Sequence, residues 1–149
     1  MTALRLGSGG PWEDVVGYSR VVAVGDQAWV SGCTATVDGE VVHAGDMGAQ
    51  ARVAMSVLVT ALESAGFSAA DVVRTRMYVT DTSRWEEAGR AHGEVFGAVR
   101  PATAMIGVAG LLHPDMLVEV EADAVRGSGE MGTAVRGSGE TAAVRVVDA

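Results

Sequence analysis

The chain has 149 residues, of which 48% are hydrophobic and 20% are charged, a size and balance that predict one globular domain with a substantial core. The formal net charge is −8 and the sequence contains no lysine, which argues against nucleic acid as a main partner because phosphates are bound by clustered basic side chains. A single cysteine excludes an internal disulfide, and no apolar run approaches the roughly 20 residues of a membrane span. Residues 1–10 lack the hydrophobic core of a signal peptide, so we expect a cytoplasmic protein without membrane partners.

The N-terminal half predicts short strands and a long helix after a glycine-rich start. Residues 1–13 are expected to be irregular. Turn dipeptides that begin at Gly25 and Asp38 separate three stretches rich in β-forming residues. These strands are expected at 18–24, 27–34 and 41–42. From Asp46, a good N-cap, apolar residues recur at helical spacing as far as Gly66, which predicts a helix over this segment.

The C-terminal half predicts three further strands and a second helix. The strands are expected at 72–80, 103–108 and 117–125. On the first of them, the residues expected on the buried face are Val73, Thr75, Met77 and Val79. Thr82 or Ser83 is expected to cap the helix, whose apolar stripe includes Trp85 and His92. The order βββ-α-β-α-ββ predicts an α+β fold with both helices on one face of the sheet.

Two of these strands carry dense charge on the face opposite the apolar one. Arg74 and Arg76 are spaced by two on one strand, and Glu119, Glu121 and Asp123 are spaced by two on the other. Such charges can lie in water, or they can pair across strands and subunits around a wet pocket. The sequence leaves both alternatives open.

The last part of the chain differs in composition from the rest. Residues 124–130 recur as 134–140, ten residues further on, which predicts a Gly/Ser-rich extension from 126 to 149 after a domain that ends at 125. This extension is either a flexible tail or the source of an added edge strand at 142–147.

Several short motifs, taken in order, resemble the Rid family (YjgF/YER057c/UK114). They are Gly17-Tyr18-Ser19, Val30-Ser31-Gly32, residues 71–75, residues 100–105 and residues 118–122. The resemblance implies a chorismate-mutase-like fold with a mixed sheet, and a homotrimer whose sheets form a central barrel. It further implies three clefts between subunits for a small polar metabolite, and hydrolysis of reactive imines and enamines such as 2-iminobutanoate and 2-iminopropanoate.

The resemblance also implies roles for individual residues. Glu119 corresponds to the catalytic glutamate that positions the attacking water, and Tyr18 to the aromatic residue that closes the pocket. The remaining cleft residues implied are Ser31, Gly32, Cys33, Thr103 and Met105, the last through nearby backbone amides. The family's helix asparagine corresponds to Gly89, and its substrate-binding arginine corresponds to Thr103, so we expect a divergent branch.

Thr103 matters because a threonine cannot replace an arginine that binds a carboxylate. A charge-assisted pair contributes about 1.5–3 kcal/mol, whereas one hydroxyl offers a single neutral hydrogen bond. Either carboxylate substrates are lost or another arginine serves, with Arg76 the first candidate and Arg20 and Arg100 next. A deaminase-like hydrolase, a non-catalytic binding protein and an enzyme recruited to a specialised pathway therefore remain open. Ribonuclease activity is disfavoured by the acidic charge.

Other candidate groups have simpler interpretations. Nothing nearby in the sequence would lower the pKa of Cys33, which favours a small buried hydrophobic residue, and His92 favours a hydrogen-bonded core histidine. His43, His113 and Cys33 show no metal-ligand spacing, and the glycine-serine runs of the extension lack the ending of a phosphate-binding loop. We therefore expect no metal and no cofactor.

Overall fold

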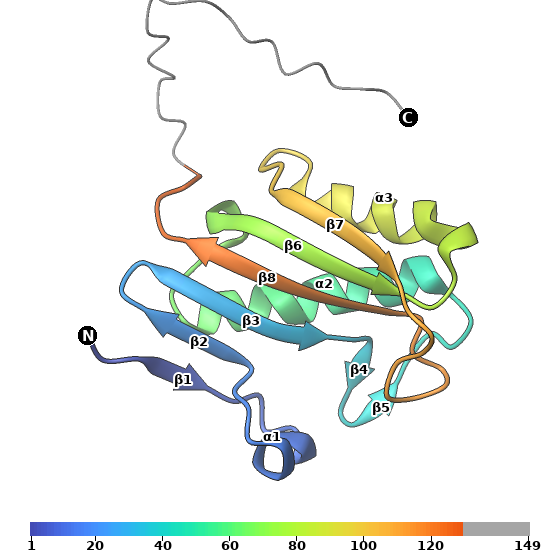
Figure 1. Cartoon of the computed structure of the whole chain (residues 1–149), viewed down its shortest axis with the longest axis horizontal. Helices are drawn as coiled ribbons and strands as arrows, with labels where there is room; N and C mark the ends of the chain where they lie inside the picture. The colour runs from blue at the N-terminus through green and yellow to red at the C-terminus, as the bar shows by residue number, and fades with distance from the viewer. Residues whose placement is uncertain (130–149) are drawn as a thin grey trace, which may run out of the picture.

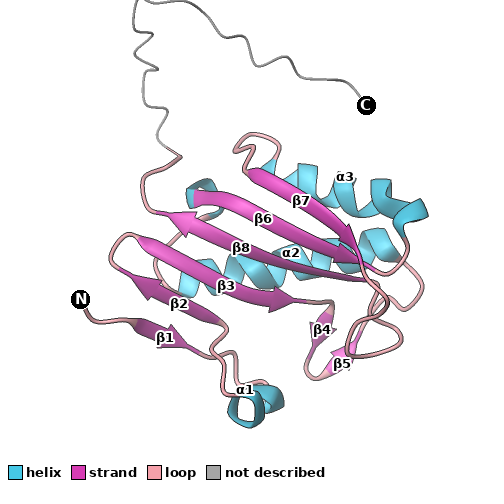
Figure 2. Ribbon diagram, in the orientation of Figure 1, coloured by secondary structure: helices cyan, strands magenta, loops and turns pink. Residues whose placement is uncertain are grey.

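In the computed structural model of the chain, which describes residues 1–129, two long helices cover one face of a six-stranded sheet (Figures 1 and 2). The strands of this sheet, in spatial order, are β1 (Leu4–Leu6), β2 (Val21–Val24), β3 (Gln27–Cys33), β8 (Val118–Val125), β6 (Val72–Val79) and β7 (Ala102–Gly107). The helices are α2 (Met47–Ser64) and α3 (Trp85–Phe96). The β6–β7 pair is parallel and the other pairs are antiparallel, so the expected α+β class with a mixed sheet is confirmed.

Smaller elements connect these parts. They are α1 (Pro11–Val16), the hairpin β4 (Thr36–Val37) and β5 (Glu40–Val41), and the 3-10 turns η1 (Ala69–Asp71) and η2 (Thr82–Arg84). Among the described residues, no helix combines the length and the apolar character needed to span a bilayer. The second copy of the ten-residue repeat and the possible strand at 142–147 lie outside the described residues.

The core lies between the sheet and α2 and α3, and it is built mainly from small and aliphatic side chains. On β8 every second residue is buried, and these residues are Val118, Val120, Ala122 and Ala124. They face the buried stripe of α2, which includes Met55, Leu58 and Leu62. Strand periodicity therefore directs Glu119, Glu121 and Asp123 to the opposite face, which no helix of the described chain covers.

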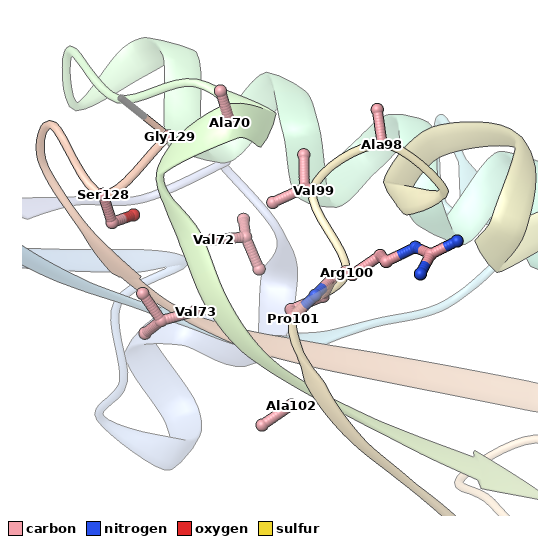
Figure 3. A pocket seen from close by; sticks show the side chains of 10 residues that line it. All are labelled: Ala70, Val72, Val73, Ala98, Val99, Arg100, Pro101, Ala102, Ser128 and Gly129. Atoms are coloured by element: carbon pink, nitrogen blue, oxygen red, sulfur yellow. The ribbon is translucent and has the colours of Figure 1, made fainter. Parts of the chain in front are cut away.

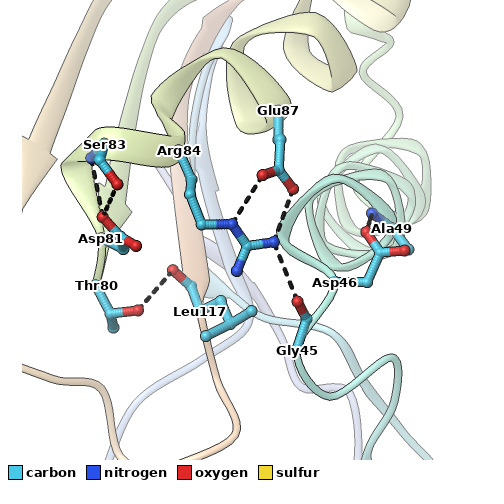
Figure 4. Close-up of polar contacts among 9 residues, drawn as sticks. All are labelled: Gly45, Asp46, Ala49, Thr80, Asp81, Ser83, Arg84, Glu87 and Leu117. Carbon is cyan, nitrogen blue, oxygen red and sulfur yellow. Dashed lines mark hydrogen bonds and ion pairs between the residues drawn. The ribbon is translucent and has the colours of Figure 1, made fainter.

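Asp46 and Asp81 cap two of the helical segments, and only Asp46 does so where the sequence predicts a cap. The Asp46 carboxylate accepts a hydrogen bond from Ala49 N at 2.9 Å, which confirms it as the N-cap of α2. Asp81, rather than Thr82 or Ser83, caps the next turn, because its carboxylate accepts from both Ser83 N and Ser83 Oγ (Figure 4).

An arginine then ties the two helices together at their starts. Arg84 donates to Glu87 in the first turn of α3 and, through Nη2, to the carbonyl of Gly45 at 3.0 Å, just before α2 (Figure 4).

Three expectations about local structure are wrong. Residues 1–13 are not irregular throughout, since β1 pairs with β2 and α1 begins at Pro11. Val73 is 37% exposed, because a register shift between Val72 and Arg74 places Val72 in the core instead. Trp85 is 55% exposed, because the buried side of α3 consists of Ala88, Ala91 and Phe96.

A buried glutamine fixes the segment that leads into β8. The Gln50 side chain is fully buried on α2, and its Nε2 donates to Val42 O at 3.1 Å and Asp115 O at 2.7 Å. Its Oε1 accepts from Leu117 N at 2.8 Å. Because buried polar groups are costly when unpaired, these bonds hold the backbone immediately before Glu119 in one position.

The first residues after β8 remain in contact with the body. The Arg126 guanidinium lies 4.2 Å from the centre of the Phe67 ring and donates to the carbonyl of Gly66. Gly127 N donates to Asp71 Oδ1 at 2.8 Å, and Ser128 Oγ donates to Asp71 O at 3.0 Å. The chain therefore follows the domain surface through residue 128.

Candidate functional site

A bulge in β3 sets the geometry of the candidate site. Val30 pairs with Ala122 and Cys33 pairs with Val120, so three steps along β3 match two steps along β8. The extra residue turns the Cys33 side chain into the core, where it is 1% exposed, and leaves Gly32 beside Glu119.

The Glu119 carboxylate occupies the space that a side chain at position 32 would need. A Cβ added to Gly32 would lie 1.9 Å from Glu119 Oε1, far inside contact distance. Within residues 1–129, no side chain forms an ion pair with this carboxylate and no hydrogen bond is donated to it. Burial raises the pKa of Glu119, and the charge of Glu121 raises it further, whereas Arg20 acts in the opposite direction.

Arg20, just before β2, also contacts Gly32. Its Nη1 donates to the carbonyl of Gly32 and lies 3.6 Å from Cys33 Sγ, and its Nη2 donates to the Tyr18 hydroxyl at 3.1 Å. The guanidinium carbon is 5.5 Å from the centre of the Tyr18 ring. Arg20 Nε is buried and has no hydrogen-bond partner among the described residues, a situation that costs about 1–3 kcal/mol.

The expected cleft residues of β3 gather here with Tyr18. Ser31 Oγ donates to Ser19 O at 2.7 Å, which fixes the bulge against the segment that carries Tyr18 and Arg20. Burial raises the pKa of the Cys33 thiol to about 11, partly opposed by Arg20. Cys33 is therefore a neutral thiol packed in the core rather than a nucleophile.

Arg76 belongs to a separate group of charges on the same face. Its Nη1 donates to Glu121 Oε1 at 3.0 Å and its Nη2 to Asp123 Oδ2 at 3.4 Å. The Tyr78 hydroxyl also donates to Glu121 Oε1, at 3.1 Å. The charges of this face thus pair across strands. Arg76, the first candidate to replace the family's arginine, is already bound to two carboxylates. Glu119 does not belong to this group.

Thr103 lies on the opposite, helix-facing side of the sheet from Glu119. The parallel register pairs Thr103 with the buried Thr75, and their hydroxyls are 2.9 Å apart. Thr103 donates to Pro101 O at 3.0 Å, and Thr75 Oγ1 lies 2.8 Å from His92 Nε2. Because the Thr103 proton is committed to Pro101, Thr75 donates to Thr103 and His92 donates to Thr75.

His92 and Met105 share the helix-facing side with this hydrogen-bonded chain. Burial lowers the pKa of His92, which favours the neutral ring that donates to Thr75. Met105 packs against the core. Within one chain, therefore, neither Thr103 nor Met105 meets Glu119.

The pocket between β6, β7 and the residues after β8 is a different feature (Figure 3). It has a volume of about 510 Å³ and is lined mainly by apolar side chains, with Arg100 and Ser128 at its rim. It lies at the Val72 end of β6, whereas Glu119 pairs with Tyr78 near the other end. Arg100 is therefore remote from Glu119 in the same chain.

Of the three candidate arginines, only Arg20 lies beside Glu119. From the sequence, Arg20 is a weaker candidate than Arg76. The signal in its favour is its position two residues after Tyr18. Across residues 1–129, no three His, Cys, Asp or Glu side chains gather in a way that could hold a metal ion.

Replacing Gly32 with alanine tests the contact with Glu119. We expect Gly32→Ala to lower the free energy of unfolding by about 1–3 kcal/mol, because the new methyl group must displace the Glu119 carboxylate or the bulge. Gly93→Ala is the matched control: its Cβ would meet nothing within 4 Å on α3, so it should raise stability by about 0.5–1 kcal/mol. The free energies of unfolding of both variants can be measured by urea denaturation. Equal changes in the two variants would contradict the described position of Glu119.

Comparisons with known proteins agree with this architecture. The family model described as endoribonuclease L-PSP matches residues 12–126. The structure of Rv2704 from Mycobacterium tuberculosis, a member of the YjgF/YER057c/UK114 family, is similar with a TM-score of 0.76 and 45% identity, covering 83% of this chain and 99% of that one.

Two further relatives have more specific descriptions. Escherichia coli TdcF with bound serine has a TM-score of 0.69 and 25% identity, covering 82% of this chain and 93% of that one. The 3-aminoacrylate deaminase RutC of Acinetobacter baylyi is 33% identical over 81 residues, which are 54% of this chain and 64% of RutC. The family match and the shared fold together establish that the chain belongs to the YjgF/YER057c/UK114, or Rid, family.

Proposed function

We propose that the protein binds a small polar metabolite in a cleft between subunits of a homotrimer and hydrolyses a reactive imine there. The observation that carries this proposal is Glu119, a half-buried carboxylate with a raised pKa and no partner among the described residues. Perturbed, unpaired acids are typical of functional sites. The relatives support the class of chemistry, since one is named a 3-aminoacrylate deaminase and another was crystallised with serine.

In the proposed reaction, Glu119 acts as a general base and then as a general acid. Its carboxylate accepts a proton from a water molecule while the water oxygen bonds to the imine carbon, and it passes this proton to the imine nitrogen, which gives a neutral carbinolamine. Glu119 then accepts the proton of the carbinolamine hydroxyl and transfers it to the amino nitrogen, so that the carbonyl forms as the C–N bond breaks and ammonia leaves. A raised pKa brings this carboxyl closer to neutral pH, where proton transfer in both directions is efficient.

A cleft between subunits accounts for residues that do not meet within one chain. β7, which carries Thr103 and Met105, is an edge strand, so another subunit can approach it. In the proposed trimer, β7 of one subunit lies against the Glu119 side of the next. Arg76 stays with Glu121 and Asp123 and does not contact the metabolite.

The homotrimer has its own test. The sheet face opposite the helices exposes Trp29 and Val125 beside the charged strands, and aromatic residues make up only 5% of the chain, so burial of this face between subunits would add stability. We expect sedimentation equilibrium at micromolar concentration to give three times the chain mass of 15.2 kDa. A stable monomer would contradict the intersubunit cleft.

A non-catalytic binding protein is the second candidate. Thr103 favours it, because this residue stands at the position of the family's arginine and its hydroxyl is already bonded to Pro101 and Thr75. Binding of small acids without turnover of any freshly generated imine would select this alternative.

Glu119→Gln separates a functional role for this residue from a structural one. We expect turnover of freshly generated 2-iminobutanoate to fall by about 100-fold or more, the usual effect of losing a general acid–base group. In the wild type, turnover should decrease as the pH falls through the raised pKa of Glu119, because the protonated carboxyl cannot accept a proton.

Glu119→Gln should not lose stability, although it should lose turnover. Burial raises the pKa of Glu119, so the charged form costs folding free energy above that pKa, and the cost vanishes below the pKa of the unfolded chain. Glu119→Gln should therefore melt at the same or a higher temperature at neutral pH, with no difference in acid. Glu121→Gln, which removes a partner of Arg76, is the control and should lower the melting temperature. Reduced melting with retained turnover in Glu119→Gln would refute the proposal.

A further inference from the structure

Arg20 differs from the other arginines of the described chain in its environment. Six arginines lie within 4.0 Å of a carboxylate, and these are Arg52, Arg74, Arg76, Arg84, Arg90 and Arg126. Within residues 1–129, Arg5 and Arg100 lack such a partner but are exposed to solvent, whereas Arg20 is partly buried. A partly buried cation that forms no ion pair calls for an anion.

The hydrogen bonds of Arg20 do not pair its charge with a carboxylate, although Glu13 and Glu119 interact with that charge from beyond ion-pair distance. Its acceptors are neutral, namely the Gly32 carbonyl, the Cys33 sulfur and the Tyr18 hydroxyl, and sulfur is a weak acceptor. Its Nε is the one side-chain nitrogen or oxygen in the described part of the chain that is buried without a partner. Nε and Nη2 form one edge of the guanidinium, and a carboxylate bound to that edge would accept two parallel hydrogen bonds.

Arg20 and Glu119 lie close to each other without forming an ion pair. Arg20 bonds the carbonyl of Gly32, while the Glu119 carboxylate lies where a Cβ of Gly32 would be. Their charges interact, yet within residues 1–129 no atoms of the two groups approach within ion-pair distance. A ligand with an anionic group and an N–H group a few atoms apart complements both.

We propose that Arg20 binds the carboxylate of the ligand, in place of the arginine that Thr103 has replaced, and that the ligand is a small amino or imino acid whose nitrogen faces Glu119. The Tyr18 ring, which lies against the guanidinium, moves aside to admit the carboxylate to Nε. This inference rests on the proposed site, but it does not require the proposed reaction.

Calorimetric titration with matched probes tests the assignment. The probes are 2-oxobutanoate and its neutral analogue 2-oxobutanamide. We expect wild type to bind the carboxylate at least about tenfold more tightly than the amide, because only the carboxylate forms a charge-assisted pair. Arg20→Gln should weaken carboxylate binding by about tenfold or more and remove the preference, while Arg20→Lys should keep part of it. Arg100→Gln, at the distant pocket, should leave both affinities unchanged.

Glu119→Gln supplies an independent signature in the same assay. Removing its negative charge should strengthen the binding of 2-oxobutanoate and weaken the binding of L-serine, whose ammonium group would face Glu119. If Arg20 has a purely structural role, the ratio of the affinities for 2-oxobutanoate and L-serine should be the same in Glu119→Gln as in wild type.

The outcomes separate this inference from the proposed reaction. Arg20-dependent carboxylate binding without imine turnover supports the inference and overturns the reaction. Turnover that depends on Glu119 but is unchanged in Arg20→Gln supports the reaction and overturns the inference. Equal affinity of wild type for carboxylate and amide, or no carboxylate binding at millimolar concentration, overturns the inference. If Arg20→Gln does not fold, the preference for 2-oxobutanoate over 2-oxobutanamide can be compared between wild type and Arg20→Lys, and this comparison still tests the inference.

Discussion

The Glu119 carboxylate can lie where it does only because position 32 has no side chain. The bulge in β3 brings a glycine to this point, and the same bulge turns Cys33 into the core and directs the Gly32 carbonyl to Arg20. Gln50 then fixes the backbone that leads to Glu119 from the other side. A carboxylate and a guanidinium are thereby both held against one residue, without being paired to each other.

Strand register explains why one acid of β8 is available while the other two are not. The acids and the residues opposite them on β6 are Asp123 with Arg74, Glu121 with Arg76 and Glu119 with Tyr78. The tyrosine hydroxyl donates to Glu121 rather than to the acid opposite it. Glu121 and Asp123 therefore belong to a cross-strand ion-pair group that stabilises the sheet, whereas Glu119 carries a partly buried charge that forms no ion pair within residues 1–129. Charge of that kind is costly, which is why it suggests function.

The sequence predicts regular features well and irregular ones poorly. The alternation along 118–125 and the Asp46 cap follow from periodicity and capping chemistry, and both are correct. Periodicity assumes an unbroken register, so neither the exposure of Val73 nor the bulge at Gly32 could be predicted from it. The order of the motifs identifies Tyr18 and Glu119 as candidates. The parallel register that places Thr103 beside Thr75 is set by tertiary packing, and so is the proximity of Arg20 to Glu119.

The ionisation of Glu119 itself is the most direct test of this account. The carboxyl carbon of Glu119 can be followed by NMR as the pH changes, with its signal assigned by its absence from Glu119→Gln. We expect a pKa above the ordinary range of glutamate, because the group is partly buried and unpaired within residues 1–129, and a further rise when Arg20 is replaced by glutamine. A pKa at or below the ordinary range, or one insensitive to Arg20, would mean that Glu119 is solvated or paired and would contradict the central claim.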